Sequence, residues 1–158
     1  MNKDVREKVL NLLKGYSRMV QEISILRYQL DHMPALSEDD MIASMNFSHG
    51  ERLAESSKYG VSNKTQSIAL SYKEAMARER EELRKELRLN LHELERERDE
   101  LLRRIDLLDG EKALVLRLYY IDNKSWDETA VNLGFSKRTA QRIRDIAVSE
   151  LCRIYEAL

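Results

Sequence analysis

The sequence predicts an all-α fold, with long N-terminal helices (an antiparallel or coiled-coil pair) followed by a C-terminal module of three shorter helices. Only 5 glycines and 1 proline occur among the 158 residues, so few residues interrupt a helix. Charged residues make up 35% of the chain and aromatic residues 6%, which suits long solvated helices better than one large core. The patterns indicate an N-terminal heptad helix, a mobile connector, a long charged helix and the C-terminal module, at residues 1–33, 34–63, 64–108 and 109–158.

The first predicted helix runs from about Lys3 to Met33 and is ended by Pro34. Its apolar residues recur at alternating steps of four and three, the heptad pattern of a helix with a narrow seam for a partner helix. The seam positions are Val5, Val9, Leu12, Tyr16, Met19, Ile23, Leu26 and Leu30. The unbroken seam favours a homodimer through the long helices, although pairing within one chain is the open alternative.

The connector, residues 34–63, is rich in Ser, Asn, Asp and Gly and has no sustained period. A stretch of this length without periodic structure is unusual inside a compact domain. We expect a mobile segment with one or two helical turns, the first of them beginning near Ser37 and ending by Met45.

The third segment, residues 64–108, predicts a long helix without glycine or proline. Opposite charges recur four residues apart, and each pair contributes only about 0.2–0.5 kcal/mol. These pairs are Glu74 with Arg78, Glu81 with Lys85, Asp99 with Arg103 and Glu100 with Arg104. Because the two signs are mixed and cancel, we expect a solvated face and not a nucleic-acid-binding stripe.

The C-terminal module opens with Asp109, a good N-cap residue, before a nearly continuous apolar run from Ala113 to Ile121 that predicts a buried helix. A turn follows at residues 122–124. Ser125 and Glu128 then form the serine and glutamate spacing of a capping box, which opens a short helix ending near Leu133.

A tight turn joins this short helix to the last one. Gly134 suits the left-handed residue that closes a helix, and Ser136 suits the cap of the next helix. Two helices joined in this way meet at a steep angle, as in a helix-turn-helix. We expect Ala130 at the contact between them, and the space to be filled by Leu133, Phe135, Ala140 and Ile143.

The last helix, residues 137–155, carries apolar and polar residues on opposite faces. The predicted inner face comprises Ala140, Ile143, Ala147, Leu151 and Ile154. The polar face is richest near the helix N-terminus, the end that enters the DNA major groove in a helix-turn-helix. On it, Arg138, Gln141 and Arg142 are expected to contact bases. Phosphate contacts are expected from Lys124, Ser136, Lys137, Thr139 and Arg144.

The bulk charge of the chain does not itself indicate a nucleic-acid partner. The chain has 27 basic and 28 acidic side chains and a formal net charge of −1, so affinity for double-stranded DNA has to come from this local patch. The same helical spacing puts Cys152, the only cysteine, on the exposed arc of the last helix, where we expect an incidental reduced thiol.

The chain resembles known families, most strongly in its C-terminal module. Residues 119–151 resemble the fourth-region helix-turn-helix of bacterial sigma factors, and the whole layout is similar to phage and prophage late regulators of the RinA and ArpU type. The stronger similarity covers residues 108–158, and a weaker one begins at residues 59–62. The resemblance implies control of late or packaging genes and contact with RNA polymerase. It departs from sigma factors in lacking their other regions and in being less basic at residues 139–141, so it implies a different target sequence.

Enzymatic chemistry is not indicated. His32, His49 and His92 are scattered without ligand spacing, and no glycine-rich phosphate loop occurs, so we expect no metal, no cofactor and no small-molecule substrate. No apolar run is long enough for a bilayer and no signal-peptide core is present, so we expect no membrane contact and a location in the bacterial host cytoplasm.

Two other functions fit the same elements. A small terminase-like subunit for phage DNA packaging also joins a helix-turn-helix to oligomerising helices, and it predicts a ring of many copies. A helical adaptor that binds RNA polymerase without reading DNA predicts no salt-dependent affinity for DNA.

Overall fold

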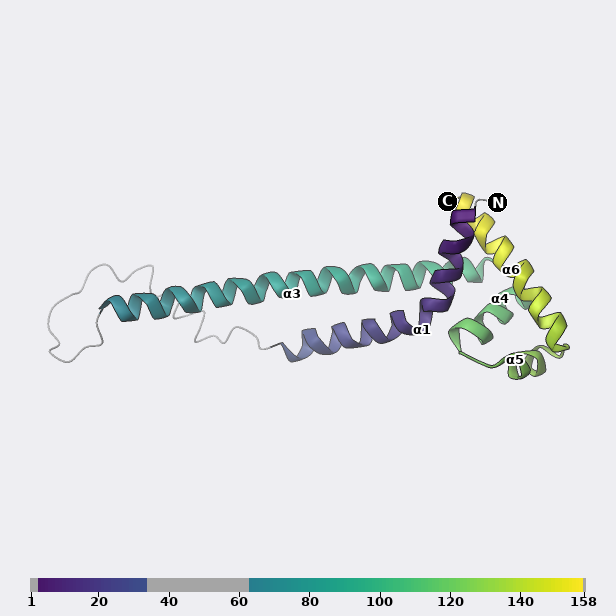
Figure 1. Ribbon diagram of the computed structural model, residues 1–158, viewed down its shortest axis with the longest axis horizontal. Helices are drawn as coiled ribbons and strands as arrows, with labels where there is room; N and C mark the ends of the chain where they lie inside the picture. Colours follow the sequence, from purple (N-terminus) through teal and green to yellow (C-terminus); the bar gives the residue numbers. More distant parts are fainter. Residues whose placement is uncertain (1–2, 34–62, 158) are drawn as a thin grey trace. The chain divides into compact units, whose positions relative to one another are not determined.

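The computed structural model describes residues 3–33 and 63–157, and the regular secondary structure of these residues is entirely helical, with no strand among them (Figure 1). The all-α prediction is therefore confirmed for the described parts of the chain. The predicted short helix at residues 37–45 lies outside them. The elements are α1 (Lys3–His32), α3 (Asn63–Asp106), α4 (Gly110–Leu116), the π-helix η1 (Arg117–Ile121), α5 (Trp126–Leu133) and α6 (Lys137–Ala157).

The chain divides into two compact units, which are residues 1–25 with 91–158, and residues 26–90. The first unit therefore contains the start of α1 and the end of α3 together with α4, η1, α5 and α6. The sequence predicts that the start of α1 is part of a separate heptad helix and that the C-terminal module begins at residue 109. The boundaries of the compact unit differ because residues far apart in the chain share one core.

The first unit contains a core cluster of buried side chains from several helices. Val9 and Leu13 of α1 are 0% and 1% exposed, and the end of α3 supplies Leu101 and Ile105, both fully buried. The other members are Leu108, Val115, Leu116, Tyr120, Ala147, Val148, Leu151 and Cys152. Complete burial of a leucine or valine side chain stabilises a fold by about 1.5–3 kcal/mol, so α1 contributes directly to the stability of the C-terminal helices.

The predicted seam of α1 is buried or half-buried along its length, with Val9, Met19 and Ile23 the most buried members. Leu13 lies off that seam and is also buried. The buried face of α1 is therefore wider than a heptad seam, as expected for a helix packed into a core and not against one partner helix.

Polar contacts connect the elements of the first unit. The ammonium of Lys112 in α4 lies 2.7 and 2.9 Å from the two carboxylate oxygens of Glu150 in α6, and these contacts raise its pKa. Asp109 stands at the N-cap of α4, but its side chain makes no capping bond and instead pairs with Lys112 at 3.1 Å. Arg117 of η1 pairs with Asp106 at the end of α3. The predicted pair of Arg104 with Glu100 is also present.

The second unit contains the end of α1 and most of α3. A guanidinium nitrogen of Arg84 donates to the carbonyl of Met33, at 3.1 Å, and so satisfies one of the carbonyl groups that a helix end leaves free. The ring of His32 stacks on that of Tyr28 with their centroids 3.8 Å apart. Several large apolar side chains of this unit are exposed, namely Tyr28, Tyr72, Leu83 and Leu89.

None of the helices in the described ranges combines the length and the apolar character needed to cross a bilayer.

Candidate nucleic-acid interface

The capping box predicted for α5 is confirmed. The hydroxyl of Ser125 accepts a hydrogen bond from the backbone N–H of Glu128 at 3.3 Å, and the backbone N–H of Ser125 donates to the Glu128 carboxylate at 2.8 Å. The backbone bond, followed by one from the Ser125 hydroxyl, lowers the pKa of the Glu128 carboxyl. The box gives α5 a defined first residue, Trp126.

The turn between α5 and α6 consists of residues 134–136, as predicted. Gly134 has a left-handed backbone, with φ 70° and ψ 25°, and the N–H of Phe135 donates to the carbonyl of Ala130 at 3.0 Å. Ser136 accepts a hydrogen bond from the N–H of Thr139 at 3.2 Å and so caps α6. The two helices diverge steeply from this turn (Figure 1).

Small side chains lie where α5 and α6 meet. Ala130 is 6% exposed and Ala140 is fully buried, so the two backbones approach closely, while Leu133 and Ile143 are half-buried beside them. Phe135 was expected to fill this space, and that expectation is wrong, because its side chain is 37% exposed. Phe135 follows the left-handed glycine, where the chain has left α5, and its ring stays at the surface of the turn.

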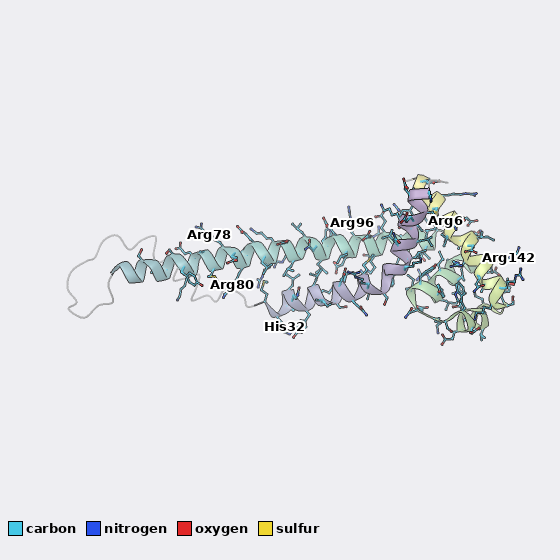
Figure 2. All side chains as sticks on the ribbon, viewed as in Figure 1. Arg6, His32, Arg78, Arg80, Arg96 and Arg142 are labelled. Carbon is cyan, nitrogen blue, oxygen red and sulfur yellow. The ribbon has the colours of Figure 1, made fainter. Side chains whose placement is uncertain are left out.

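The polar face predicted for α6 lies in its first two turns. Arg138 and Arg142 are exposed and Gln141 is half-buried, on the side opposite to Ala140 and Ala147. Figure 2 shows the Arg142 side chain directed away from the helices of its unit. Neither Arg138 nor Arg142 forms an ion pair with any residue that the structure describes. Both guanidinium groups are therefore available to a ligand.

Four of the five residues predicted to contact phosphates lie near the starts of α5 and α6. Lys137 and Thr139 are exposed in the first turn of α6 beside Ser136, and Lys124 is half-buried ahead of α5. Lys137 pairs with Asp127 at 3.1 Å, with just over half of its side chain exposed (52%). The hydroxyls of Ser136 and Thr139 lie 2.9 Å apart. Lys124 therefore lies just before α5, and Ser136, Lys137 and Thr139 lie at the start of α6.

Arg144 is held inside the unit. Its guanidinium lies 5.2 Å from the centre of the Trp126 ring and forms an ion pair with Asp145 at 2.9 Å. Burial by itself would lower its pKa, but a hydrogen bond with Tyr120 and the charge of Asp145 raise it. This geometry favours a packing role for Arg144 over the predicted phosphate contact.

Cys152 is fully buried, so its predicted exposure is wrong. A helical wheel assigns one buried face to α6, but the C-terminal half of α6 packs into a core that also contains α1 and α3. The start of α1 lies beside the last turns of α6 in Figure 1, and Arg6 is close enough to affect the pKa of the thiol. Burial raises that pKa.

A groove of about 690 Å³ lies between α1, η1 and the first residues of α5 and α6. Leu13, Lys14 and Ser17 of α1 line one side of it. Across from them lie Tyr119, Tyr120, residues 123–128 and Lys137. Sequence reasoning missed Lys14 and Ser17, because both lie off the apolar seam and no local pattern connects them to the C-terminal helices.

The described residues contain no group of three or more His, Cys, Asp or Glu side chains that could hold a metal ion. Of the histidines, His32 donates a hydrogen bond from its Nδ1 to the carbonyl of Tyr28 at 2.8 Å and His92 is exposed, while His49 is outside the described ranges.

Comparisons with models of protein families, with curated proteins and with solved structures find no match for this chain. The resemblance of residues 108–158 to sigma factors and phage regulators therefore stays a prediction, and the function has to be inferred from the chemistry of the exposed face of α6.

Proposed function

We propose that this protein is a sequence-specific DNA-binding transcription regulator whose α5 and α6 form a helix-turn-helix, with α6 reading the major groove. One observation carries the proposal. Arg138 and Arg142 present unpaired, exposed guanidinium groups in the first two turns of α6, next to Gln141. The opposite side of the same helix is packed into the core through Ala140, Ala147 and Leu151.

The chemistry of these side chains matches base edges in the major groove. A guanidinium group can bridge O6 and N7 of guanine, and a glutamine amide can bridge N6 and N7 of adenine. The preceding turn ends at Ser136, where the first amides of α6 suit a DNA phosphate. Base-reading and phosphate-binding groups therefore occupy the same end of α6, as this docking mode requires.

The chain has a net charge of −1, so long-range attraction to DNA is weak and a single small reading head has limited affinity. We propose that the protein acts as a homodimer through its long helices, with two heads on two half-sites. The start of α1 is already buried in the first unit. We place the dimer contact on residues 26–33 and 63–90, where Tyr28, Tyr72 and Leu83 are exposed.

The biological setting that we propose follows the resemblance of residues 108–158. It is control of late or packaging genes of a phage or prophage, in the cytoplasm of a bacterial host, with RNA polymerase as a second partner. Its distinguishing test is footprinting on the DNA around the gene itself.

The proposal is tested by selecting bound sequences from a library of random duplexes and then measuring affinity for the selected site. Arg138→Ala and Arg142→Ala should each weaken binding by about 1–3 kcal/mol and relax the base preference at one position. Arg153→Ala is the matched control, since Arg153 is exposed in the last turns of the same helix. Unchanged affinity in both test variants, with the fold intact by circular dichroism, would disprove the proposed reading face.

A second candidate is a helical adaptor that docks on another protein through the turn. The observation in its favour is apolar exposure at this turn, where Val131 is 80% and Phe135 37% exposed. The adaptor predicts no dependence of DNA affinity on salt, whereas a protein that neutralises phosphates loses affinity steeply as salt rises. A salt titration with random-sequence duplex DNA separates the two.

A further inference from the structure

The first half of α1 holds a lysine next to the proposed reading head. Val9 and Leu13 of α1 are buried in the same core as α4 and α6, so this part of α1 has a defined position in the first unit. Leu13 also lines the groove described above, together with Lys14 and Ser17. Since Lys14 and Ser17 are three residues apart on a helix, their side chains lie on one face.

The far side of the groove is built from η1 and the beginnings of α5 and α6. The ring of Tyr119 stacks on that of Trp126, with the centroids 3.9 Å apart and the planes inclined by 21°. Both rings line the groove together with Lys124 and Lys137. Lysines from α1, from the turn before α5 and from α6 therefore line one groove.

The carboxylates of the groove already have partners. Asp127 pairs with Lys137, and Glu128 accepts hydrogen bonds from Ser125. Lys14 is exposed and forms no ion pair within the described parts of the chain. Its ammonium is therefore free to neutralise an external anion.

The groove reaches the first turn of α6, where Lys137 lines it, and the same turn carries Arg138 of the proposed DNA-reading face. We propose that the backbone of a DNA strand bordering the major groove runs along this groove, and that Lys14 and Ser17 contact its phosphates beside Lys124 and Lys137. This inference rests on the proposed DNA-binding function. It makes α1 part of the DNA-binding surface and not only a helix for oligomerisation.

Because a phosphate contact does not depend on base sequence, the test needs no knowledge of the target site. The affinity of the full chain for a fluorescein-labelled duplex of random sequence is measured by anisotropy at several KCl concentrations. Lys14→Gln should reduce the slope of log affinity against log salt by about 0.9 and weaken binding about five-fold at physiological salt, as expected for one lost phosphate contact.

Lys8→Gln is the matched control. Lys8 is also exposed on α1, but it lines a different groove, with Asn11, Gly15 and Glu97. Its replacement changes the net charge by the same amount and should leave the slope unchanged. In the same way, Ser17→Asp should weaken binding by repelling the phosphates, whereas Asn11→Asp should not.

The outcomes separate this inference from the function on which it rests. If Lys14→Gln and Lys8→Gln behave alike while the wild type binds DNA with a steep salt dependence, α1 lies outside the interface and the proposed function stands. If the wild type shows no salt-dependent binding, both proposals fail. Thermal melting by circular dichroism identifies any variant whose loss of binding comes from unfolding, and Lys14→Arg, which keeps the charge, should restore the slope.

Discussion

The guanidinium of Arg104, near the end of α3, lies 3.8 Å from the centre of the Tyr155 ring in the last turns of α6. Glu100, one turn earlier in α3, pairs with the same guanidinium. The Arg104 side chain is only 14% exposed, so the cation is held against the ring in a partly desolvated position. A cation over an aromatic face contributes about 0.5–2 kcal/mol, depending on its exposure. This contact ties the end of the long helix to the end of the chain.

Two replacements of Tyr155 should distinguish the contribution of its aromatic ring to stability from that of its hydroxyl group. Burial raises the pKa of Tyr155, and the charge of Arg104 opposes that shift only in part. Because the folded-state pKa lies above the value of about 10 in an unfolded chain, the neutral phenol contributes stability that is present below about pH 10. That stability is lost as the pH rises through the folded-state pKa.

We therefore expect Tyr155→Leu to lower the free energy of unfolding by about 1 kcal/mol at neutral pH through loss of the cation–ring contact. Tyr155→Phe should keep that contact. As the pH rises from 9 to 11, its free energy of unfolding should fall less than that of the wild type, because the variant has no phenol to ionise. This window is centred on the ordinary tyrosine pKa of about 10. Urea unfolding at several pH values measures both effects. Equal pH dependence in the wild type and Tyr155→Phe would show that the Tyr155 phenol is not buried in the folded state.

Thr129 of α5 is a buried polar residue without a partner. Its side chain is fully buried, and its hydroxyl oxygen has no hydrogen bond with any described residue. Burying an unsatisfied hydroxyl costs about 1–3 kcal/mol, and valine has nearly the same shape. Thr129→Val should therefore raise the free energy of unfolding by about 1 kcal/mol. Thr139→Val is the control, since the Thr139 hydroxyl lies 2.9 Å from that of Ser136, and it should not stabilise the protein.

Cys152 should be unreactive in the folded protein. The thiol is buried and burial raises its pKa, so neither access nor thiolate is available to a thiol reagent. Labelling with a chromogenic disulfide reagent should be slow in buffer and rapid in urea above the unfolding midpoint. Prompt stoichiometric labelling in buffer would place Cys152 at the surface, as the helical wheel had suggested.

The two glycines at Gly15 and Gly134 should respond in opposite directions to alanine. A Cβ atom at Gly15 meets only open space, and the residue is inside α1, so Gly15→Ala should stabilise the protein by about 0.5–1 kcal/mol. Gly134 has φ +70°, where a Cβ atom is strained, so Gly134→Ala should cost about 1–2 kcal/mol. Thermal melts of the two variants side by side provide the comparison. A stabilised Gly134→Ala variant would contradict the left-handed turn on which the α5–α6 arrangement depends.

The features that the sequence determined by itself are those set by residues close together in the chain. The capping box of Ser125 and Glu128, the left-handed Gly134 and the cap at Ser136 all depend on groups within four residues of one another. The ends of α1 and α3 were predicted within two residues for the same reason, since Pro34 and the turn at Asp109 stop the helices locally. The exposed positions of Arg138 and Arg142 follow from the period of α6.

The tertiary structure alone decided which residues share a core, because burial depends on contacts between segments far apart in the sequence. It placed the start of α1 with the C-terminal helices, buried Cys152 and Leu13, and left Phe135 at the surface. It also brought Lys14 to the groove that Lys137 lines. A helical period assigns one face to each helix, whereas a helix packed against two neighbours buries more than one face, and only the fold determines which neighbours those are.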